Sequence, residues 1–293
     1  MGRIKVGISA WTEPTLIKSG WYPPDATTAE DRLRYYASKF PVVEVDSTFY
    51  ALPNQKTSQL WVERTPKDFT FNAKAHALLT QHPTPPARLP KDLREKLGES
   101  KGNVYFKDLA PKAKERVWDL FREGLQPLHD AGKLGAIVFQ FPKWFLPSPA
   151  SYRFMEDLRE WLPDFGIAIE FRQVAWMKEE RRARVLKFLE DHAFTYVAVD
   201  EPQGFTSSVP PVVAVTAPRG MVRFHGRNRE TWEKKGISTA EKFRYLYQPS
   251  ELQPWVASLR DMANRAGEVH AVFNNCYSDY AVRNAEDLSQ LLT

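Results

Sequence analysis

The feature that most restricts the fold is a regular alternation of two kinds of segment along the chain. Eight short runs are rich in β-branched and aromatic residues, at 4–9, 42–46, 70–76, 136–141, 167–172, 195–200, 221–225 and 269–275. Amphipathic stretches typical of helices separate most of them, at 29–40, 58–64, 111–131, 151–161, 178–192, 249–266 and 285–292. Strands that alternate with helices indicate βαβ units and a parallel sheet.

Two parallel-sheet architectures fit this alternation. A doubly wound sheet more often has five or six strands and a glycine-rich first turn, but residues 9–14 read Ser-Ala-Trp-Thr-Glu-Pro. Eight units can close a barrel, and a chain of 293 residues suits a (β/α)8 barrel. We therefore predict an α/β fold: a single TIM-like (β/α)8 barrel over residues 1–293, with a long loop-plus-helix connection after the third strand.

Polar residues gather on one face of the predicted strands, near their C-terminal ends. Alternate strand positions share a face, and the other face is apolar throughout, as at Val43 and Val45 or Val222 and Phe224. Barrel enzymes place their chemistry at the C-terminal mouth. We therefore expect one cavity to be lined by Glu44, Asp46, Lys74, His76, Gln140, Glu170, Arg172, Asp200, Arg223, His225 and Asn274.

The carboxylates of this set support two interpretations. Glu44 and Glu170 can form a general acid/base pair, with His225 transferring a proton near neutral pH. Alternatively, neighbouring arginine and lysine side chains neutralise both carboxylates in a structural ion-pair network. The sequence leaves both interpretations open.

The cations of the set favour an anionic ligand. Arginine presents a planar donor fork to phosphate or carboxylate, and lysine adds a point charge. We expect an enzyme, a hydrolase or lyase, whose phosphate-bearing or nucleotide-like substrate is oriented by Lys74, Arg172, Arg223 and Arg227. The competing class is a barrel that binds a ligand or nucleic acid without turnover.

Aromatic residues follow several strands directly. Trp11, Tyr50 and Trp176 lie just after predicted strands or in the next loop, where they can stack on a sugar or base. Large aromatic side chains in barrel loops also cap the core. We include the three as candidate substrate-binding residues.

Metal binding is a weaker alternative. Glu44, His76, Glu170, Asp200 and His225 are suitable ligand types for a metal-dependent hydrolase. The neighbouring cations oppose a divalent ion, and the sequence has no HExxH spacing. We predict no cofactor and no resident metal, and a divalent metal remains the minor possibility.

Composition restricts the partners and the compartment. The net charge of +5, from 41 basic and 36 acidic residues, supports nucleic-acid binding only weakly. The single cysteine forbids an intrachain disulfide and fits a reducing compartment. The first residues lack a signal-peptide core, and no apolar run approaches about 20 residues. We expect a cytoplasmic protein without a membrane partner, and the sequence does not indicate an oligomeric state.

Several motifs are similar to those of the DUF72, or YecE-like, family. They are Gly-Ile-Ser-Ala-Trp at 7–11, Val-Glu-Val-Asp-Ser-Thr-Phe-Tyr at 43–50, Phe-Gln-Phe-Pro at 139–142, Glu-Phe-Arg at 170–172, Arg-Phe-His-Gly-Arg at 223–227 and Phe-Asn-Asn at 273–275. The resemblance implies a TIM-like barrel of uncharacterised function. Gln173 stands where the family typically has a histidine, although the tryptophan three residues on remains as Trp176.

Overall fold

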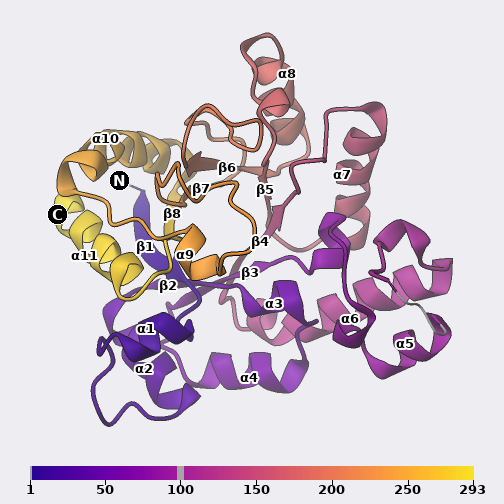
Figure 1. Cartoon of the computed structure of the whole chain (residues 1–293), viewed down its shortest axis with the longest axis horizontal. Coiled ribbons are helices and arrows are strands. Elements are labelled where there is room, and N and C mark those ends of the chain that lie inside the picture. The colour runs from indigo at the N-terminus through magenta and orange to yellow at the C-terminus, as the bar shows by residue number, and fades with distance from the viewer. Residues whose placement is uncertain (1, 98–101) are drawn as a thin grey trace.

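The computed structural model describes residues 2–97 and 102–293, and a closed barrel of parallel strands forms its centre (Figure 1). The strands follow one another around the barrel in chain order, and β8 pairs with β1 to close it. They are β1 Arg3–Ser9, β2 Val42–Val45, β3 Thr70–Lys74, β4 Leu134–Gln140, β5 Ile167–Glu170, β6 Thr195–Asp200, β7 Arg219–Phe224 and β8 Glu268–Phe273. The predicted TIM-like barrel is confirmed, and each predicted strand region overlaps one of these strands.

Helices surround the barrel in Figure 1. The longer ones are α2 Ala29–Lys39, α4 Gln55–Glu63, α6 Pro111–Asp130, α7 Pro149–Trp161, α8 Glu179–Asp191, α10 Pro249–Ala266 and α11 Tyr280–Leu292. Each overlaps a helix expected from the sequence. Shorter helical segments in the loops are α1 Pro14–Lys18, α3 Ser47–Tyr50, α5 Lys91–Leu97, α9 Thr239–Lys242, η1 Ala77–Thr80, η2 Pro86–Arg88, η3 Phe106–Asp108 and η4 Val174–Trp176.

The helix α6 shows why these segments fold against the barrel. Val117, Phe121, Leu125 and Leu128 recur every three or four residues and are fully buried. Full burial of one such side chain contributes about 2 kcal/mol relative to leaving it in water. Pro111 occupies the first turn, where its missing amide proton costs no helical hydrogen bond.

Two connections depart from a plain strand–helix repeat. The predicted long connection between β3 and β4 contains η1, η2, α5 and η3 before α6, and Thr84 and Val104 form an isolated antiparallel bridge within it. The connection between β6 and β7, residues 201–218, is described throughout and contains no helix. Both lie at the C-terminal ends of their strands, where they shape the mouth.

The pairing register sets polar side chains at a common level inside the barrel. Ser9 pairs with Glu44, and Gln140 pairs with Glu170. On β3, Asn72 pairs in register with Glu44, and its Oδ1 accepts a hydrogen bond from the amide of Ala136 at 3.1 Å. A Cβ atom on Gly135 would lie 2.5 Å from that same oxygen, so a glycine is needed there.

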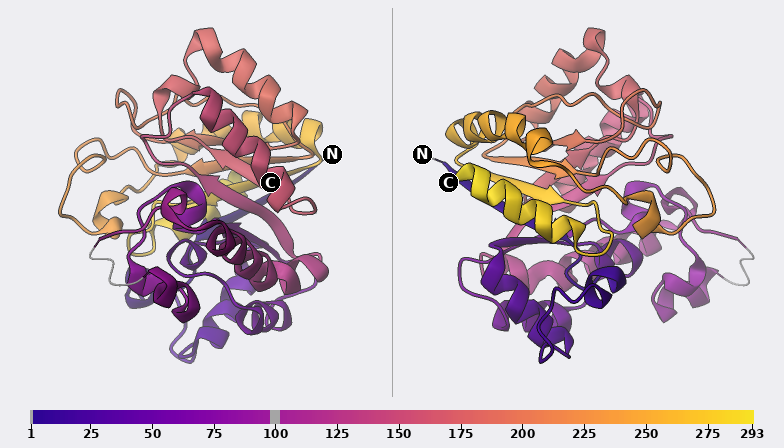
Figure 2. Two further views of the ribbon diagram at one scale, coloured as in Figure 1. Left: turned by 90° about the vertical axis from the view of Figure 1, so that its right-hand side faces the viewer. Right: turned by 60° about the vertical axis from the view of Figure 1, so that its left-hand side comes forward.

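The chain ends and the mouth lie at opposite ends of the barrel. Figure 2 shows both termini together at one end, while the segment that contains α9 projects at the other. Within residues 2–97 and 102–293, no helix is both long and apolar enough to span a bilayer.

Candidate functional site

The deepest part of the site is an arginine between two glutamates. Arg223 Nη2 donates to Glu44 Oε1, and Nη1 donates to Glu170 Oε2, with all three side chains fully buried. Ser9 Oγ also donates to Glu44 Oε1 at 2.9 Å. A buried charge is tolerated only when it is paired and hydrogen-bonded, and β2, β5 and β7 supply that pairing across the barrel.

Glu170 accepts further hydrogen bonds around its other oxygen. Gln140 Nε2 lies 2.7 Å and Arg172 Nη1 3.2 Å from Glu170 Oε1. His225 Nε2 lies 3.1 Å from the same oxygen, while His225 Nδ1 lies 3.0 Å from Asn274 Nδ2. Both nitrogens of the imidazole are therefore occupied. We call Glu44, Glu170, Arg223 and His225 the inner cluster.

The protonation states within the inner cluster follow from burial and from Arg223. Burial favours protonated Glu170, but Arg223 together with His225 and Arg172 outweighs burial and holds the pKa of Glu170 well below its usual range. Burial raises the pKa of Glu44, and Arg223 offsets only part of that effect. Burial lowers the pKa of His225 to about 4, so its imidazole is neutral at pH 7.

A third glutamate that the sequence did not single out lies just above the inner cluster. Glu201 follows β6, its side chain is fully buried, and its Oε2 lies 3.4 Å from Arg172 Nη1. Its Oε1 accepts from the amide of Val209 at 2.7 Å. Burial raises the pKa of Glu201 to about 8, against the opposing charge of Arg172. A pKa near 8 favours the protonated carboxyl at pH 7.

Lysines and an arginine surround the opening. Lys74 Nζ is 3.6 Å from Asp46 Oδ1, and Lys143 Nζ is 3.9 Å from Glu233 Oε1. The Arg172 guanidinium lies over the Trp232 ring at 4.5 Å, and Lys242 Nζ lies 5.8 Å from the same ring centroid. We call these four basic residues the mouth cations: Lys74, Lys143, Arg172 and Lys242.

The pKa values of two groups at the mouth are lowered in part by neighbouring cations. Burial lowers the pKa of Lys242, and the charges of Arg172 and Lys143 lower it further. Burial also lowers the pKa of His82 to about 4, with Lys74 and Arg172 adding to the effect. A positive potential favours anions. No periodic pattern in the sequence marks Lys242 or His82, because both lie in long connections.

The prediction that Asp200 lies in this cavity is wrong. Asp200 pairs in register with Phe224, whose ring packs 5.2 Å from that of Trp255 in α10, so both face the helices. Its carboxylate accepts from Trp255 Nε1 at 2.9 Å and from the Tyr247 hydroxyl at 2.8 Å. The alternation along β6 places Val199, and then Glu201, on the inner side instead.

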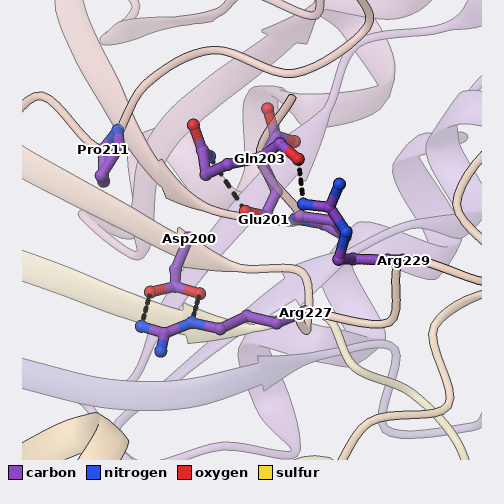
Figure 3. A pocket seen from close by; sticks show the side chains of 7 residues that line it. Asp200, Glu201, Gln203, Pro211, Arg227 and Arg229 are labelled. Carbon is purple, nitrogen blue, oxygen red and sulfur yellow. Dashed lines mark hydrogen bonds and ion pairs between the residues drawn. The ribbon is translucent and has the colours of Figure 1, made fainter. Parts of the chain in front are cut away.

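Arg227 lies outside the inner cluster and pairs with Asp200. Its Nε and Nη2 donate to the two oxygens of Asp200 at 2.8 and 2.6 Å, as the dashed lines in Figure 3 show. With Gln203 and Arg229, these residues line a cavity of about 320 Å³. Arg227 is thus placed to act in this outer cavity, not beside Arg223.

Two further candidate residues are not exposed to the mouth. His76 is fully buried, its Nδ1 accepts from the amide of Leu78 at the start of η1, and burial lowers its pKa to about 4. Trp176 is fully buried between aromatic rings, 4.4 Å from Phe171 and 5.5 Å from Phe145. The expectation that Trp176 stacks on substrate is wrong, because η4 turns it into the core.

The remaining candidates line a second side of the mouth. Trp11, Asp46, Tyr50 and Asn274 contribute to a cavity of about 480 Å³ at the ends of β1, β2 and β8. Trp11 is buried against Trp61, whereas Tyr50 is exposed. Of these two rings, Tyr50 is therefore the one open to stacking.

The metal-ligand types do not come together. Asp200 faces the helices, His76 binds the amide of Leu78 through Nδ1, and the other three candidates are bound to Arg223 or to one another. Over residues 2–97 and 102–293, no group of three or more His, Cys, Asp or Glu side chains is placed to hold a metal ion.

The closed parallel barrel and the polar mouth at its C-terminal end define the class: a TIM-like α/β barrel protein with a buried arginine–glutamate network. Comparison with known sequences gives the family. The model of DUF72, described as "Protein of unknown function DUF72", matches residues 5–293. The chain therefore belongs to the DUF72 family.

Related proteins agree with this assignment. The UPF0759 protein YunF of Bacillus subtilis is 30% identical over 293 residues, which are 99% of this chain and 94% of that protein. A DUF72 family protein of Enterococcus faecalis, EF0366, superimposes with a TM-score of 0.79 at 27% identity, covering 99% of this chain and 95% of that one. The Thermotoga maritima DUF72 protein TM1631 gives a TM-score of 0.77 at 28% identity, with 99% of both chains covered.

Proposed function

We propose that the protein is an enzyme that acts on a small anionic substrate, phosphate-bearing or nucleotide-like, by general acid/base chemistry at the C-terminal mouth. The observation that carries this proposal is the position of Arg172 Nη1 between two buried glutamates, 3.2 Å from Glu170 Oε1 and 3.4 Å from Glu201 Oε2. The pKa of Glu170 is held well below its usual range, whereas burial raises the pKa of Glu201 to about 8. Carboxyl pairs whose environments separate their pKa values are typical of acid/base catalysts.

In this proposal the mouth cations bind the charge of the substrate. Arg172 offers a planar donor fork, and Lys74 adds a point charge from the neighbouring side of the barrel. Only 13% of the Arg172 side chain and 12% of the Lys74 side chain are exposed. Charges held this close to the interior are weakly screened by water, which strengthens their attraction for an anion.

Glu201 is the proton donor in this proposal. It carries a proton at pH 7 and donates it to the oxygen that gains charge in the reaction. The carboxylate that remains is stabilised by Arg172, 3.4 Å away. Glu44 and Glu170, by contrast, keep Arg223 paired and serve as support rather than as the base.

The competing function is ligand binding without turnover. It is favoured by the saturation of the inner cluster, since both nitrogens of His225 and both oxygens of Glu170 already have partners. A barrel that only binds an anion needs the mouth cations and does not need the proton of Glu201.

Calorimetric titration and product assays with a panel of phosphate monoesters separate these functions. Arg172→Ala should weaken binding of any ligand that the wild type binds. Glu201→Gln should leave binding within about two-fold and reduce turnover by about 100-fold or more, the usual range for a general acid. Arg265→Ala, on the exposed face of α10, is the matched control. Binding without turnover supports the competing function, and undiminished turnover by Glu201→Gln contradicts the role of Glu201.

A further inference from the structure

The long connection between β3 and β4 borders a further cavity beside the mouth. Its volume is about 750 Å³, within the range of small-molecule sites. We call it the aromatic groove, and six of its lining residues matter here: Tyr105, Phe106, Lys107, Lys114, Trp144 and Phe154. They come from η3, from α6 and α7, and from the loop after β4.

Two aromatic residues of the groove pack against the core, and two others are exposed to solvent. Phe106 packs against Trp118 at 6.2 Å, and Phe154 packs against Phe141 at 6.1 Å. Trp144 and Tyr105 are exposed to 52% and 38%. Large aromatic side chains left in water beside a cavity are typical of binding surfaces.

Two lysines accompany these rings. Lys107 Nζ is 5.8 Å from the Tyr105 ring centroid, and Lys114 Nζ is 5.7 Å from that of Phe106. Neither ammonium group forms an ion pair with a carboxylate of residues 2–97 or 102–293. An uncharged apolar ligand would leave both lysines unused, and an inorganic anion would leave the rings unused. A flat, electron-rich aromatic ring uses both.

Ring contacts through His82 link the wall of the groove to the mouth. The His82 ring lies 5.7 Å from that of Trp144 and 5.1 Å from that of Phe49. Lys74 Nζ in turn lies 4.8 Å from the Phe49 centroid. A chain of ring contacts therefore connects the exposed Trp144 to one of the mouth cations.

We propose that the aromatic groove holds the base of a nucleoside phosphate whose phosphate is bound by Lys74 and Arg172. This inference rests on the proposed function and narrows its substrate class from a phosphate-bearing or nucleotide-like anion to a nucleoside phosphate. The nucleobase stacks on Trp144 and Tyr105, and the two lysines face its ring nitrogens. The insertion after β3 then supplies specificity, while the barrel supplies the charged residues.

Calorimetric titration with adenosine 5′-monophosphate, ribose 5-phosphate and adenosine tests this assignment. The nucleotide should bind at least about ten-fold more tightly than ribose 5-phosphate, because stacking of one base on an aromatic side chain commonly gives that gain. Trp144→Ala should remove most of the difference, and Lys114→Ala should reduce it a few-fold. Leu146→Ala, which is equally exposed, and Lys112→Ala, on the same helix as Lys114, should change nothing.

The three ligands distinguish failure of the groove from failure of the mouth. Equal affinity for the nucleotide and ribose 5-phosphate would overturn the base site and leave the anion site standing. Equal affinity for adenosine and the nucleotide, lost in Trp144→Ala, would support the groove and overturn phosphate binding at the mouth. Absence of binding by all three ligands would overturn both. Thermal unfolding of each variant checks that its fold is retained.

Discussion

Two arginines in the barrel each lie between two glutamates and share one of them, yet they occupy different environments. Arg223 joins Glu44 to Glu170 with no exposed surface on any of the three side chains. Arg172 joins Glu170 to Glu201 and keeps 13% of its side chain exposed. The first arrangement is closed, and the second opens towards the mouth.

The difference shows how one barrel can hold a permanent ion pair around Arg223 and a titratable carboxyl beside Arg172. Around Arg223, ion pairing holds the pKa of Glu170 well below its usual range, so its carboxylate does not exchange a proton near neutral pH. Around Arg172, burial of Glu201 prevails over the arginine and its carboxyl keeps a proton. The same residue types therefore form a permanent ion pair in one place and a titratable pair one layer higher.

The largest effect should follow from removing the closed arginine. Arg223→Met keeps the approximate volume but leaves Glu44 and Glu170 without their shared counter-charge. Breaking a buried ion pair in this way costs about 3–5 kcal/mol. We expect the free energy of unfolding in urea at pH 7 to fall by that amount, or the protein to fail to fold.

The double variant Arg223→Met with Glu44→Gln sharpens this test. Glu44→Gln removes one of the two buried carboxylates that lose their pairing with Arg223, so the double variant should recover part of the lost stability. An unfolding free energy that does not recover would show that shape, rather than charge, makes Arg223 necessary.

The fold could be predicted because its signals are local. Helical periodicity in segments such as α6 and the run of strands between them are present in the sequence without knowledge of tertiary contacts. The inward-facing residues of β2, β5 and β7 could also be predicted, because those strands alternate clearly between polar and apolar side chains. Alternation is thus enough to place Glu44, Glu170 and Arg223 on one face.

The site could be predicted only in part, for reasons that particular residues show. Residues 196–199 of β6 read Tyr-Val-Ala-Val, so its two faces carry no polar contrast that fixes which one points inward. Glu201 shares a face with Val197 and Val199, and Asp200 shares the other face with Ala198, so the sequence of β6 favours neither carboxylate. Trp176 and Lys242 lie in connections, where tertiary packing alone decides whether a side chain faces the core or the mouth.

The next largest effect should be a pH dependence of stability caused by Glu201. Its pKa is about 8 in the folded protein, raised from the ordinary glutamate value of 4.5 that we assign to the unfolded chain. A raised carboxyl pKa means that the folded state binds the proton more tightly, so stability is lost as pH rises towards 8. The expected slope is about 1.4 kcal/mol per pH unit. Urea unfolding at pH 6.5 and pH 8 should show it in the wild type and not in Glu201→Gln.

The buried histidines separate this effect from others. His225 and His270 have folded pKa values lowered to about 4, so their contribution to stability is lost as pH falls from about 6.5 towards 4. That window lies below the one used for Glu201, and the two together predict a stability maximum near neutral pH. Equal slopes for the wild type and Glu201→Gln between pH 6.5 and 8 would mean that Glu201 is already ionised and the two arginine sites do not differ.

The smallest effect should come from the arginine outside the barrel. Arg227 pairs with Asp200, whose side chain is only 4% exposed, but 39% of the Arg227 side chain is exposed, so water screens this pair and its energy falls towards about 1 kcal/mol. In Arg227→Gln, Asp200 keeps its hydrogen bonds from Tyr247 and Trp255, so its carboxylate is not left without donors. We expect urea unfolding to show a loss near 1 kcal/mol and titration with phosphate esters to show unchanged affinity. A loss as large as that of Arg223→Met would contradict the distinction between closed and open arginines, since it would make an exposed pair as costly to break as a buried one.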